Sequence, residues 1–331
     1  MTSSARGNSN SMANRYPTPP RGLICPIVTP LKTDKSLDLR SLERLLRHVV
    51  RATDGILLCD VVWGEGPELP KRMRFDMVSS ALEMIMGRVP VFVTVTGHTP
   101  RDTQLFMAEV ESFADRMEYS GNLYWVDYPL YYHSNRELPQ MYRKLMAETE
   151  IPWVLGNRPD LIKERKGPGR HHNIRTSVLK KIVQNPGIRG FIFIGNLKRA
   201  GNYLKAVRFR DDFTFYDGDE IVFLKNPGLG GLIAGGSNLI PNAWLEITRS
   251  SLNRYDSERQ FHAHQESIWE SGMMVHALYS LYKVAPPFYM KKILKAVGII
   301  EDSQTVSPGR EDISGWEEKL KDFLDTYDLG V

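Results

Sequence analysis

Eight short apolar runs alternate with longer segments of helical period along the chain, and this alternation constrains the fold more than any other feature. The apolar runs are residues 22–28, 55–61, 90–95, 122–126, 153–157, 188–194, 213–217 and 231–235. Most of them are nearly continuous in apolar residues, as is typical of parallel strands covered on both faces. The sequence therefore predicts an α/β fold, a (β/α)8 TIM barrel, with a doubly wound open sheet as the alternative.

The segments between the runs have the spacing of amphipathic helices. In residues 38–50, leucine or valine recurs every three or four positions, which places these side chains on one helix face. After residue 252 the strand pattern stops and only helical segments follow. The first residues are rich in Ser, Asn, Arg and Pro and lack apolar residues for a core. We therefore expect a flexible N-terminal arm at 1–21, the barrel at 22–252 and a C-terminal helical region at 253–331.

Charge and cysteine content exclude several classes of protein. The 43 Lys and Arg residues exceed the 39 Asp and Glu residues by only four and are interleaved with them, which argues against a nucleic-acid partner. Two cysteines, Cys25 and Cys59, are too few for a disulfide scaffold or a four-ligand zinc site, so a reducing cytoplasm is expected. No apolar run reaches the roughly 18 residues of a membrane span. We expect no metal, no cofactor and no membrane partner.

One insertion follows the fifth strand. Residues 163–173 read KERKGPGRHHN, in which basic residues surround two histidines and a Gly-Pro-Gly breaks the helical period. In a barrel this loop lies on the C-terminal face, where active sites are built. It is interpreted either as a solvated surface loop or as a lid that supplies a cation for an anionic ligand.

Several motifs, in the same order along the chain, resemble one known family. They are the opening segment 22–50, GEGPEL at 64–69, the tyrosine pair at 131–132, IP at 151–152 with NRP at 157–159, GLIAGGSNLIP at 231–241 and PFYMKKILKAVG at 287–298. Together they resemble the dihydrodipicolinate synthase and N-acetylneuraminate lyase superfamily, the class I pyruvate aldolases. The resemblance implies a (β/α)8 barrel, a homodimer or homotetramer, and a Schiff base between a lysine of the sixth strand and a 2-oxo acid.

The residues that this reaction needs are replaced in this sequence. The lysine position on the sixth strand falls on Ile192, and the proton-transferring tyrosine of the fifth strand falls on Gly156. The two threonines that assist it and bind the substrate carboxylate fall on Val62 and Trp63. Of the family's catalytic positions only the tyrosine pair remains, so Tyr132 is the one catalytic candidate.

The sequence thus predicts a changed pocket at the end of the barrel. Its expected substrate-binding residues are Val62, Trp63, Gly156, Asn157, Arg158, Ile192 and Gly235. Arg158 suits a ligand carboxylate, although pairing with Asp160 is an equally good interpretation. The first hypothesis is a synthase-like barrel that cannot form the Schiff base and binds a small anionic ligand or runs altered chemistry.

Two alternatives stay open. One is an active carbon–carbon lyase or synthase whose amine comes from Lys198, Lys205 or Lys225. The other is a non-catalytic structural or regulatory subunit, in which Tyr131 or Tyr132 reaches across a subunit interface. A cavity that is filled by side chains between Trp63, Gly156 and Ile192 would argue against ligand binding there.

Overall fold

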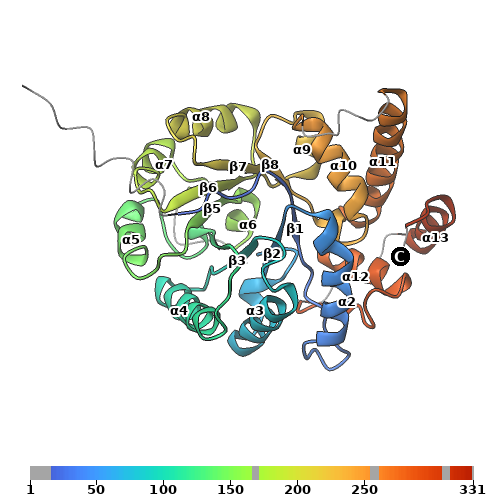
Figure 1. The fold of residues 1–331 in the computed structure, drawn as a ribbon, viewed down its shortest axis with the longest axis horizontal. Helices are drawn as coiled ribbons and strands as arrows, with labels where there is room; N and C mark the ends of the chain where they lie inside the picture. The colour runs from blue at the N-terminus through green and yellow to red at the C-terminus, as the bar shows by residue number, and fades with distance from the viewer. Residues whose placement is uncertain (1–15, 166–170, 254–260, 308–313, 330–331) are drawn as a thin grey trace, which may run out of the picture.

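A computed structural model describes residues 16–165, 171–253, 261–307 and 314–329. Its eight strands form one closed parallel barrel in which neighbours in sequence are neighbours in space (Figure 1). The strands are β1 (Gly22–Pro26), β2 (Gly55–Leu58), β3 (Val91–Thr94), β4 (Leu123–Asp127), β5 (Trp153–Asn157), β6 (Ile188–Phe193), β7 (Thr214–Asp217) and β8 (Gly231–Ile233). This confirms the predicted (β/α)8 barrel and excludes the open sheet, because β1 pairs with β8.

Helices surround the barrel and continue beyond its last strand. They are α2 (Leu39–Val49), α3 (Lys71–Ile85), α4 (Pro100–Arg116), α5 (Leu138–Leu145), α6 (Pro159–Glu164), α7 (Thr176–Ile182), α8 (Leu197–Val207), α9 (Glu220–Lys225), α10 (Pro241–Ser251), α11 (Phe261–Tyr282), α12 (Pro286–Ala296) and α13 (Trp316–Thr326). The first helix begins where Asp38 accepts hydrogen bonds from the backbone amides of Arg40 and Ser41, as an N-cap residue does. Such local signals explain why helix positions follow from the sequence.

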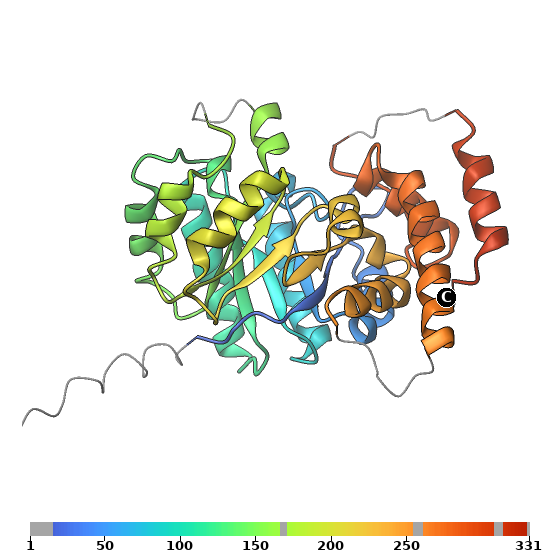
Figure 2. The same cartoon turned by 90° about the horizontal axis from the view of Figure 1, so that it is seen from above.

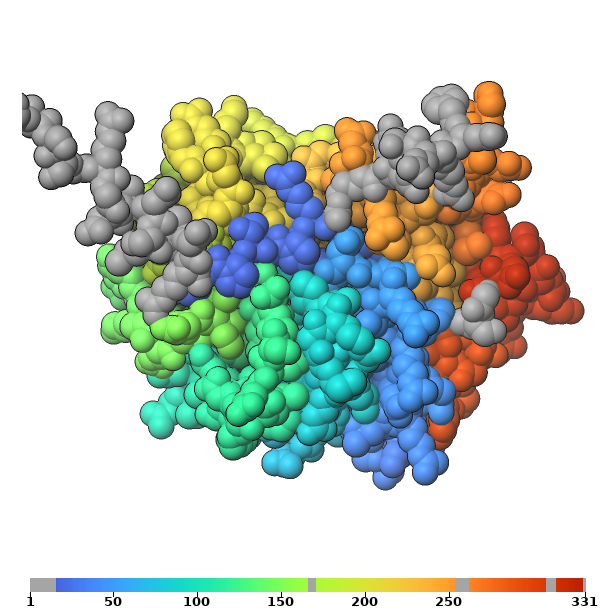
Figure 3. All heavy atoms as spheres, viewed as in Figure 1, coloured from blue at the N-terminus to red at the C-terminus, as the bar shows by residue number. Residues whose placement is uncertain are grey.

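Aromatic side chains and the N-terminal segment close the end of the barrel at which the strands begin. The ring of Phe92 on β3 stacks on Tyr124 of β4 and contacts Tyr216 of β7, across the barrel. The hydroxyls of Tyr124 and Tyr216 donate hydrogen bonds to the carbonyls of Thr18 and Pro20. Figure 3 shows the first described residues, in dark blue, lying across this face.

The expected flexible arm, residues 1–21, therefore ends in a stretch that belongs to the folded barrel. Residues 16–21 are described, and Pro19 also accepts a hydrogen bond from the hydroxyl of Thr214. The composition of the arm did not reveal this because the contacts are made by its backbone carbonyls. Residues 1–15 lie outside the described residues.

The C-terminal helices lie on one side of the barrel (Figure 2). A buried ion pair fastens them to it: the ammonium group of Lys291 on α12 donates to the carboxylate of Glu65, in the segment between β2 and α3. Lys291 also donates to the carbonyl of Gln304, and Glu65 accepts from the amide of Val306. Within the described residues, none of the helices combines the length and the apolar character that a membrane crossing requires.

Candidate active site

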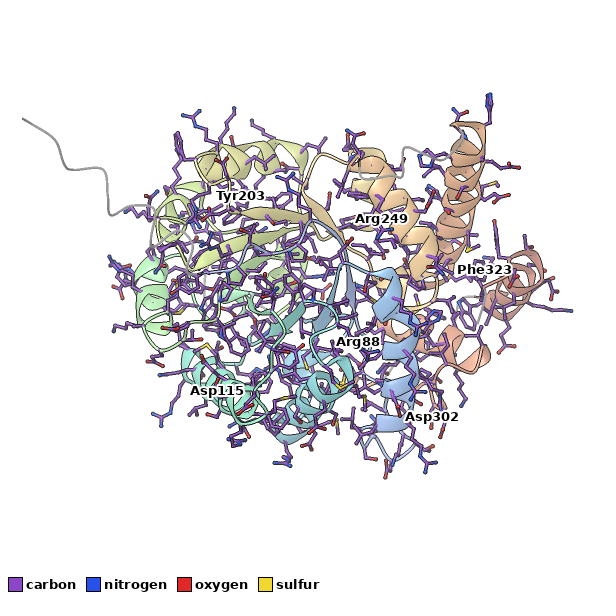
Figure 4. The ribbon with its side chains drawn as sticks, viewed as in Figure 1. Arg88, Asp115, Tyr203, Arg249, Asp302 and Phe323 are labelled. Atoms are coloured by element: carbon purple, nitrogen blue, oxygen red, sulfur yellow. The ribbon has the colours of Figure 1, made fainter. Side chains whose placement is uncertain are left out.

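Ile192, which the resemblance assigns to the position of the Schiff-base lysine, lies inside the barrel. Phe191 and Phe193 both contact the ring of Tyr203 on α8, with centroids 5.3 and 5.6 Å apart, so these two side chains point outward. Tyr203 lies between α8 and the sheet (Figure 4). Because side chains alternate along a strand, Ile192 points toward the barrel axis. It is 1 % exposed and brings no amine to the centre.

Gly156, at which the resemblance expects the proton-transferring tyrosine, lies against the ring of Tyr128. Gly156 is paired with Ile192 in the register of β5 and β6. A methyl group built on Gly156 would overlap the ring of Tyr128, which follows β4. Tyr128 is 2 % exposed. Glycine is therefore required at position 156 because the Tyr128 ring lies against its backbone.

Trp63 fills the opposite side in the same way. A methyl group built on Gly235, at the end of β8, would overlap the six-membered ring of the Trp63 indole. The indole also packs edge-on against Tyr282 of α11, with ring centroids 5.4 Å apart. Trp63 is 8 % exposed. It is therefore packed in the core, although the sequence analysis expected it to bind the substrate.

Asp60 joins the two aromatic residues. Its Oδ1 accepts hydrogen bonds from the amides of Val62 and Trp63, both at 2.9 Å, and its Oδ2 accepts from the Tyr128 hydroxyl at 3.3 Å. Burial raises the pKa of Tyr128 well above its ordinary value, and the nearby Asp60 charge raises it further. The phenol therefore stays protonated and acts here as a hydrogen-bond donor.

At the carboxyl ends of the strands, the side chains of Tyr128, Trp63 and Ile192 are buried against one another's neighbours in the core. Five of the cavities on the described part of the chain measure about 320 to 700 Å³. Trp63, Gly156, Ile192 and Gly235 line none of them. Of these four predicted site residues, Gly156 is paired with Ile192, and Gly235 lies against Trp63. All four are buried in packed side chains.

The other predicted binding residues differ in their relation to this centre: Val62 and Arg158 lie at its edge, where the Arg158 charge acts on the Tyr128 hydroxyl, and Asn157 lies outside it. Asn157 points outward, where its amide donates to Asn173 Oδ1 at 3.0 Å and its oxygen accepts from the Ile174 amide at 3.0 Å. It holds the chain that returns from the insertion. Arg158 forms an ion pair with Asp160 at 3.5 Å. Val62 is partly buried and donates its amide to Asp60.

Tyr132 is hydrogen-bonded within its own chain. Its hydroxyl donates to Asp127 Oδ2 at 2.7 Å, and Tyr142 donates to the same oxygen at 2.6 Å. Burial, and after it the Asp127 charge, raises the pKa of Tyr132 well above its ordinary value. Tyr132 is 9 % exposed. In this conformation it is not free to reach a second subunit.

Tyr131 is held by the start of the insertion. The guanidinium of Arg165 lies 3.7 Å from the centre of the Tyr131 ring and donates to its hydroxyl, which in turn donates to Glu68 at 3.0 Å. Arg165 also approaches His98 at 3.4 Å. The insertion therefore contacts the loops after β2, β3 and β4 through one basic residue. Residues 166–170 lie outside the described residues, so the two interpretations of this loop stay open.

The lysines considered as replacements lie far from the centre. Lys198 and Lys205 are exposed on α8, and Lys225 is exposed at the end of α9. Among the lysines that the structure describes, Lys291 alone is buried, and it is paired with Glu65. A Schiff-base lysine needs a desolvated, partly neutral amine beside the substrate, which none of the three candidates offers.

Two features of the centre were missed from the sequence. Tyr128 was not singled out, although Tyr124, Val126 and Tyr128 alternate along β4 and its end, which places them on one face. The buried Arg74 on α3 was also missed, because nothing in its helix sets it apart from the exposed arginines around it. No group of three or more His, Cys, Asp and Glu side chains suited to a metal ion occurs within residues 16–165, 171–253, 261–307 and 314–329.

Glu220 is a buried carboxylic acid beside the centre. Its Oε2 accepts from the Tyr282 hydroxyl at 2.6 Å and its Oε1 accepts from the Gly236 amide at 2.9 Å. Burial raises its pKa from 4.5 to about 7. Burial also raises the pKa of Asp217, from 3.8 to about 7. Both acids therefore keep their protons in the folded state at a pH where the unfolded chain has lost them.

We predict that stability decreases as the pH rises from about 4.5 to about 7. The folded chain binds more protons than the unfolded chain in this window, and Glu220 alone contributes a change of about 3 kcal/mol. Glu220→Gln removes the contribution of Glu220 to this pH dependence, and Glu301→Gln, at an exposed glutamate, is the comparison variant. Urea unfolding at several pH values measures this, and equal slopes in all three proteins would contradict the buried, protonated Glu220.

Comparison with known proteins identifies the family. The family model for the dihydrodipicolinate synthetase family matches residues 19–311. The 4-hydroxy-tetrahydrodipicolinate synthase of Thiobacillus denitrificans is 28 % identical over 232 residues, covering 69 % of this chain and 73 % of that protein. The enzyme of the same name from Ralstonia nicotianae is 26 % identical over 283 residues, covering 84 % and 87 %.

Solved structures agree in fold. The dihydrodipicolinate synthase of Bacteroides thetaiotaomicron superposes with a TM-score of 0.76 at 20 % identity, covering 94 % of this chain and 99 % of that one. A structure described as the first monomeric dihydrodipicolinate synthase variant superposes with a TM-score of 0.75 at 22 % identity, covering 93 % and 97 %. At these identities the structural likeness establishes the fold alone. Because the family model matches most of the sequence, this chain belongs to the dihydrodipicolinate synthetase family.

Proposed function

We propose that this protein is a pseudoenzyme of its family, unable to form a Schiff base with pyruvate or another 2-oxo acid. The observation that carries the proposal is the packing of Tyr128 against Gly156 and of Trp63 against Gly235, around an inward Ile192. Schiff-base formation needs a neutral amine that attacks the keto carbon with loss of water. Ile192 brings no amine to the centre, and the rings of Tyr128 and Trp63 lie against Gly156 and Gly235, where the acid would bind. Of the alternatives, a non-catalytic structural or regulatory subunit fits this packing best.

Reductive trapping tests the proposal. The full chain is incubated with pyruvate and borohydride, which converts an imine into a stable secondary amine, and is then analysed by peptide mass spectrometry. We expect no lysine to be modified in stoichiometric amount, while a lysine-dependent aldolase treated in parallel is modified fully. One stoichiometrically modified lysine would refute the proposal and identify the amine.

A second candidate function is the binding of a small anion between α3 and α4. A cavity of about 320 Å³ lies there, close to the C-terminal ends of β2 and β3. Its lining residues are Pro67, Leu69, Lys71, Arg74, Gly97, His98, Asp102, Leu105 and Phe106. This set contains two cationic side chains, a histidine and one carboxylate, and Lys71 also forms an ion pair with Glu109 at 3.1 Å. Cationic side chains that line a partly enclosed cavity favour an anionic ligand.

Arg74 is the residue that favours this second function. It is 5 % exposed, its Nη1 donates to the Thr96 carbonyl at 2.9 Å, and its Nη2 donates to the Thr94 carbonyl. Its guanidinium lies 4.1 Å from the centre of the Phe106 ring, and its Nε has no hydrogen-bond partner among the described residues. No carboxylate forms an ion pair with it there. The charge of the buried Asp127 acts on Arg74 without forming an ion pair with it. A bound anion would stabilise the buried guanidinium further.

Thermal unfolding with a series of anions tests this site. Phosphate, sulfate, pyruvate and citrate are compared at constant ionic strength, because a ligand that binds the native state raises the unfolding temperature. We expect at least one anion to raise it by several degrees, and Lys71→Glu to abolish the increase. Lys181→Glu, an exposed charge reversal on α7, is the control. If the anion raises the unfolding temperature equally in Lys71→Glu and Lys181→Glu, or does not raise it in the parent, this site is excluded.

A further inference from the structure

A cavity of about 370 Å³ lies on the outer side of the barrel, between α8 and α9 and beside the last residues of β6 and β7 (Figure 1). Its lining residues are Phe193, Leu197, Ala200, Gly201, Leu204, Asp217, Val222, Asn226, Pro227, Gly228 and Leu229. Leu197 and Leu204 on α8 are 57 % and 37 % exposed, so the cavity opens at the surface of that helix. A mostly apolar cavity of this size with few polar groups is typical of a small-molecule site.

Among the described residues that line this cavity, Asp217 is the only one with a charged side chain. The preceding residue, Tyr216, contacts Phe92 inside the barrel, so Asp217 points outward, toward the helices. Its Oδ1 accepts a hydrogen bond from the Asp219 amide at 3.0 Å, and its Oδ2 accepts none from the described residues. Asp217 is only 3 % exposed. A buried oxygen of this kind needs a hydrogen-bond partner, which the cavity leaves room for.

The surroundings of Asp217 supply no cation to this oxygen. The side chains of α8, α9 and β6 that line the cavity are uncharged. Asp219, whose charge acts on Asp217, is itself acidic and accepts hydrogen bonds from the first amides of α9. Glu220 on α9 is directed at Tyr282 and Gly236 instead.

Asp217 therefore keeps its proton for want of a positive charge beside it. Burial raises its pKa to about 7, and the Asp219 charge adds to this effect. A ligand that carries an ammonium group would supply the missing charge, because a buried carboxylate is stable when it is paired and hydrogen-bonded. An anionic ligand would instead meet a like charge.

We propose that the cavity between α8 and α9 binds a small apolar amine, with its ammonium group on Asp217 Oδ2 and its apolar body against Leu197, Leu204 and Leu229. The apolar lining alone would accept an alcohol equally well, so the carboxyl group determines the class of ligand. The site uses no residue of the barrel centre, and it is therefore independent of the loss of the Schiff base. It also differs from the cavity between α3 and α4, whose lining includes two cationic side chains.

Three probes with the same alkyl chain, hexylamine, hexanol and hexanoate, test the role of the carboxyl group. Their binding to the full chain is measured by titration calorimetry at pH 8, where Asp217 can ionise. We expect hexylamine to bind at least about tenfold more tightly than hexanol, because a buried hydrogen bond to a charged group forms only with the amine, and hexanoate not to bind. Asp217→Asn is expected to abolish the preference for the amine, whereas Asp211→Asn, at an exposed acid, keeps it. Equal binding of amine and alcohol, a preference that survives Asp217→Asn, or no binding of hexylamine at about 10 mM would refute the proposal.

A variant on α8 tests whether the amine occupies this cavity. Gly201 lines it, and a methyl group built there meets nothing within 4 Å, so a larger side chain enters free space. Gly201→Leu is therefore expected to weaken hexylamine binding at least about tenfold, with the circular dichroism spectrum and the unfolding temperature no lower than in the parent. An unchanged affinity for hexylamine in this variant would show that the amine binds elsewhere.

Proton release gives a readout that a merely structural role of Asp217 would not move. Near pH 6 the carboxyl group holds its proton and hexylamine is already an ammonium ion, so formation of the ion pair sends the carboxyl proton to the buffer. Titrations in buffers of different ionisation enthalpy are expected to show about one proton released by the parent and none by Asp217→Asn. The same release in both proteins, or none in the parent, would contradict the assignment of Asp217 as the partner of the amine.

Discussion

Gly235→Ala is expected to lower the free energy of unfolding by about 2 to 3 kcal/mol. The new methyl group would overlap the indole of Trp63, which is itself confined by Tyr282. Either the indole or the end of β8 has to move. Urea unfolding of parent and variant measures the change.

Two further variants establish that the cost arises from Trp63. Gly201→Ala is the matched control, because a methyl group there meets nothing within 4 Å and the residue lies in α8. Alanine is expected to stabilise that helix by about 0.5 to 1 kcal/mol. When Gly235→Ala is combined with Trp63→Ala, the new methyl group no longer overlaps the indole. The double variant is therefore expected to lose about 1 to 3 kcal/mol less free energy of unfolding than the two single variants lose in sum. Simple additivity would contradict the contact.

Lys291→Met is expected to lower the free energy of unfolding by about 3 to 5 kcal/mol. The substitution leaves the Glu65 carboxylate, 8 % exposed, without its cation. It also removes the ion pair between α12 and the segment after β2. The Glu65 carboxylate then keeps only its hydrogen bond from the amide of Val306. Chemical denaturation followed by circular dichroism measures the effect.

The comparison that isolates the ion pair is the double variant. Glu65→Gln with Lys291→Met removes both charges and is expected to recover most of the loss, because no uncompensated buried charge is left. Lys295→Met serves as the control, since Lys295 is half-exposed and its pair with Asp302, at 3.5 Å, contributes at most about 1 kcal/mol. A double variant as unstable as Lys291→Met alone would show that packing, and not charge, dominates at this site.

The barrel and its order were predictable because each βα unit carries its own signal. Continuous apolar runs identify the strands, and Asp38 illustrates how a capping residue marks a helix start. The inward direction of Ile192 also followed from strand alternation, with Phe191 and Phe193 on the other face. These inferences use only residues that are neighbours in the sequence.

The filling of the site was not predictable in the same way. That Gly156 lacks the tyrosine could be read from the sequence, but that Tyr128 occupies its space depends on the pairing of β4 with β5. Gly235 and Trp63 are separated by most of the barrel and meet only when β8 closes on β1. Asn157 was expected to contact a ligand, and its outward hydrogen bonds to Asn173 show why a residue next to a strand end can belong to the scaffold instead.

Two contacts between a large side chain and a glycine therefore characterise the centre of this barrel. The Tyr128 ring lies against Gly156 of β5, and the Trp63 indole lies against Gly235 after β8. Close packing of this kind supports the fold. The proposed anion site lies elsewhere, in the cavity between α3 and α4.

A crystal structure of the full chain grown in the presence of pyruvate tests the central claim most directly. The account predicts electron density for the Tyr128 ring against Gly156 and for the Trp63 indole against Gly235, with neither pyruvate nor a chain of water molecules between them and Ile192. Pyruvate bound among these residues, or an open, hydrated pocket with either ring turned away, would contradict it.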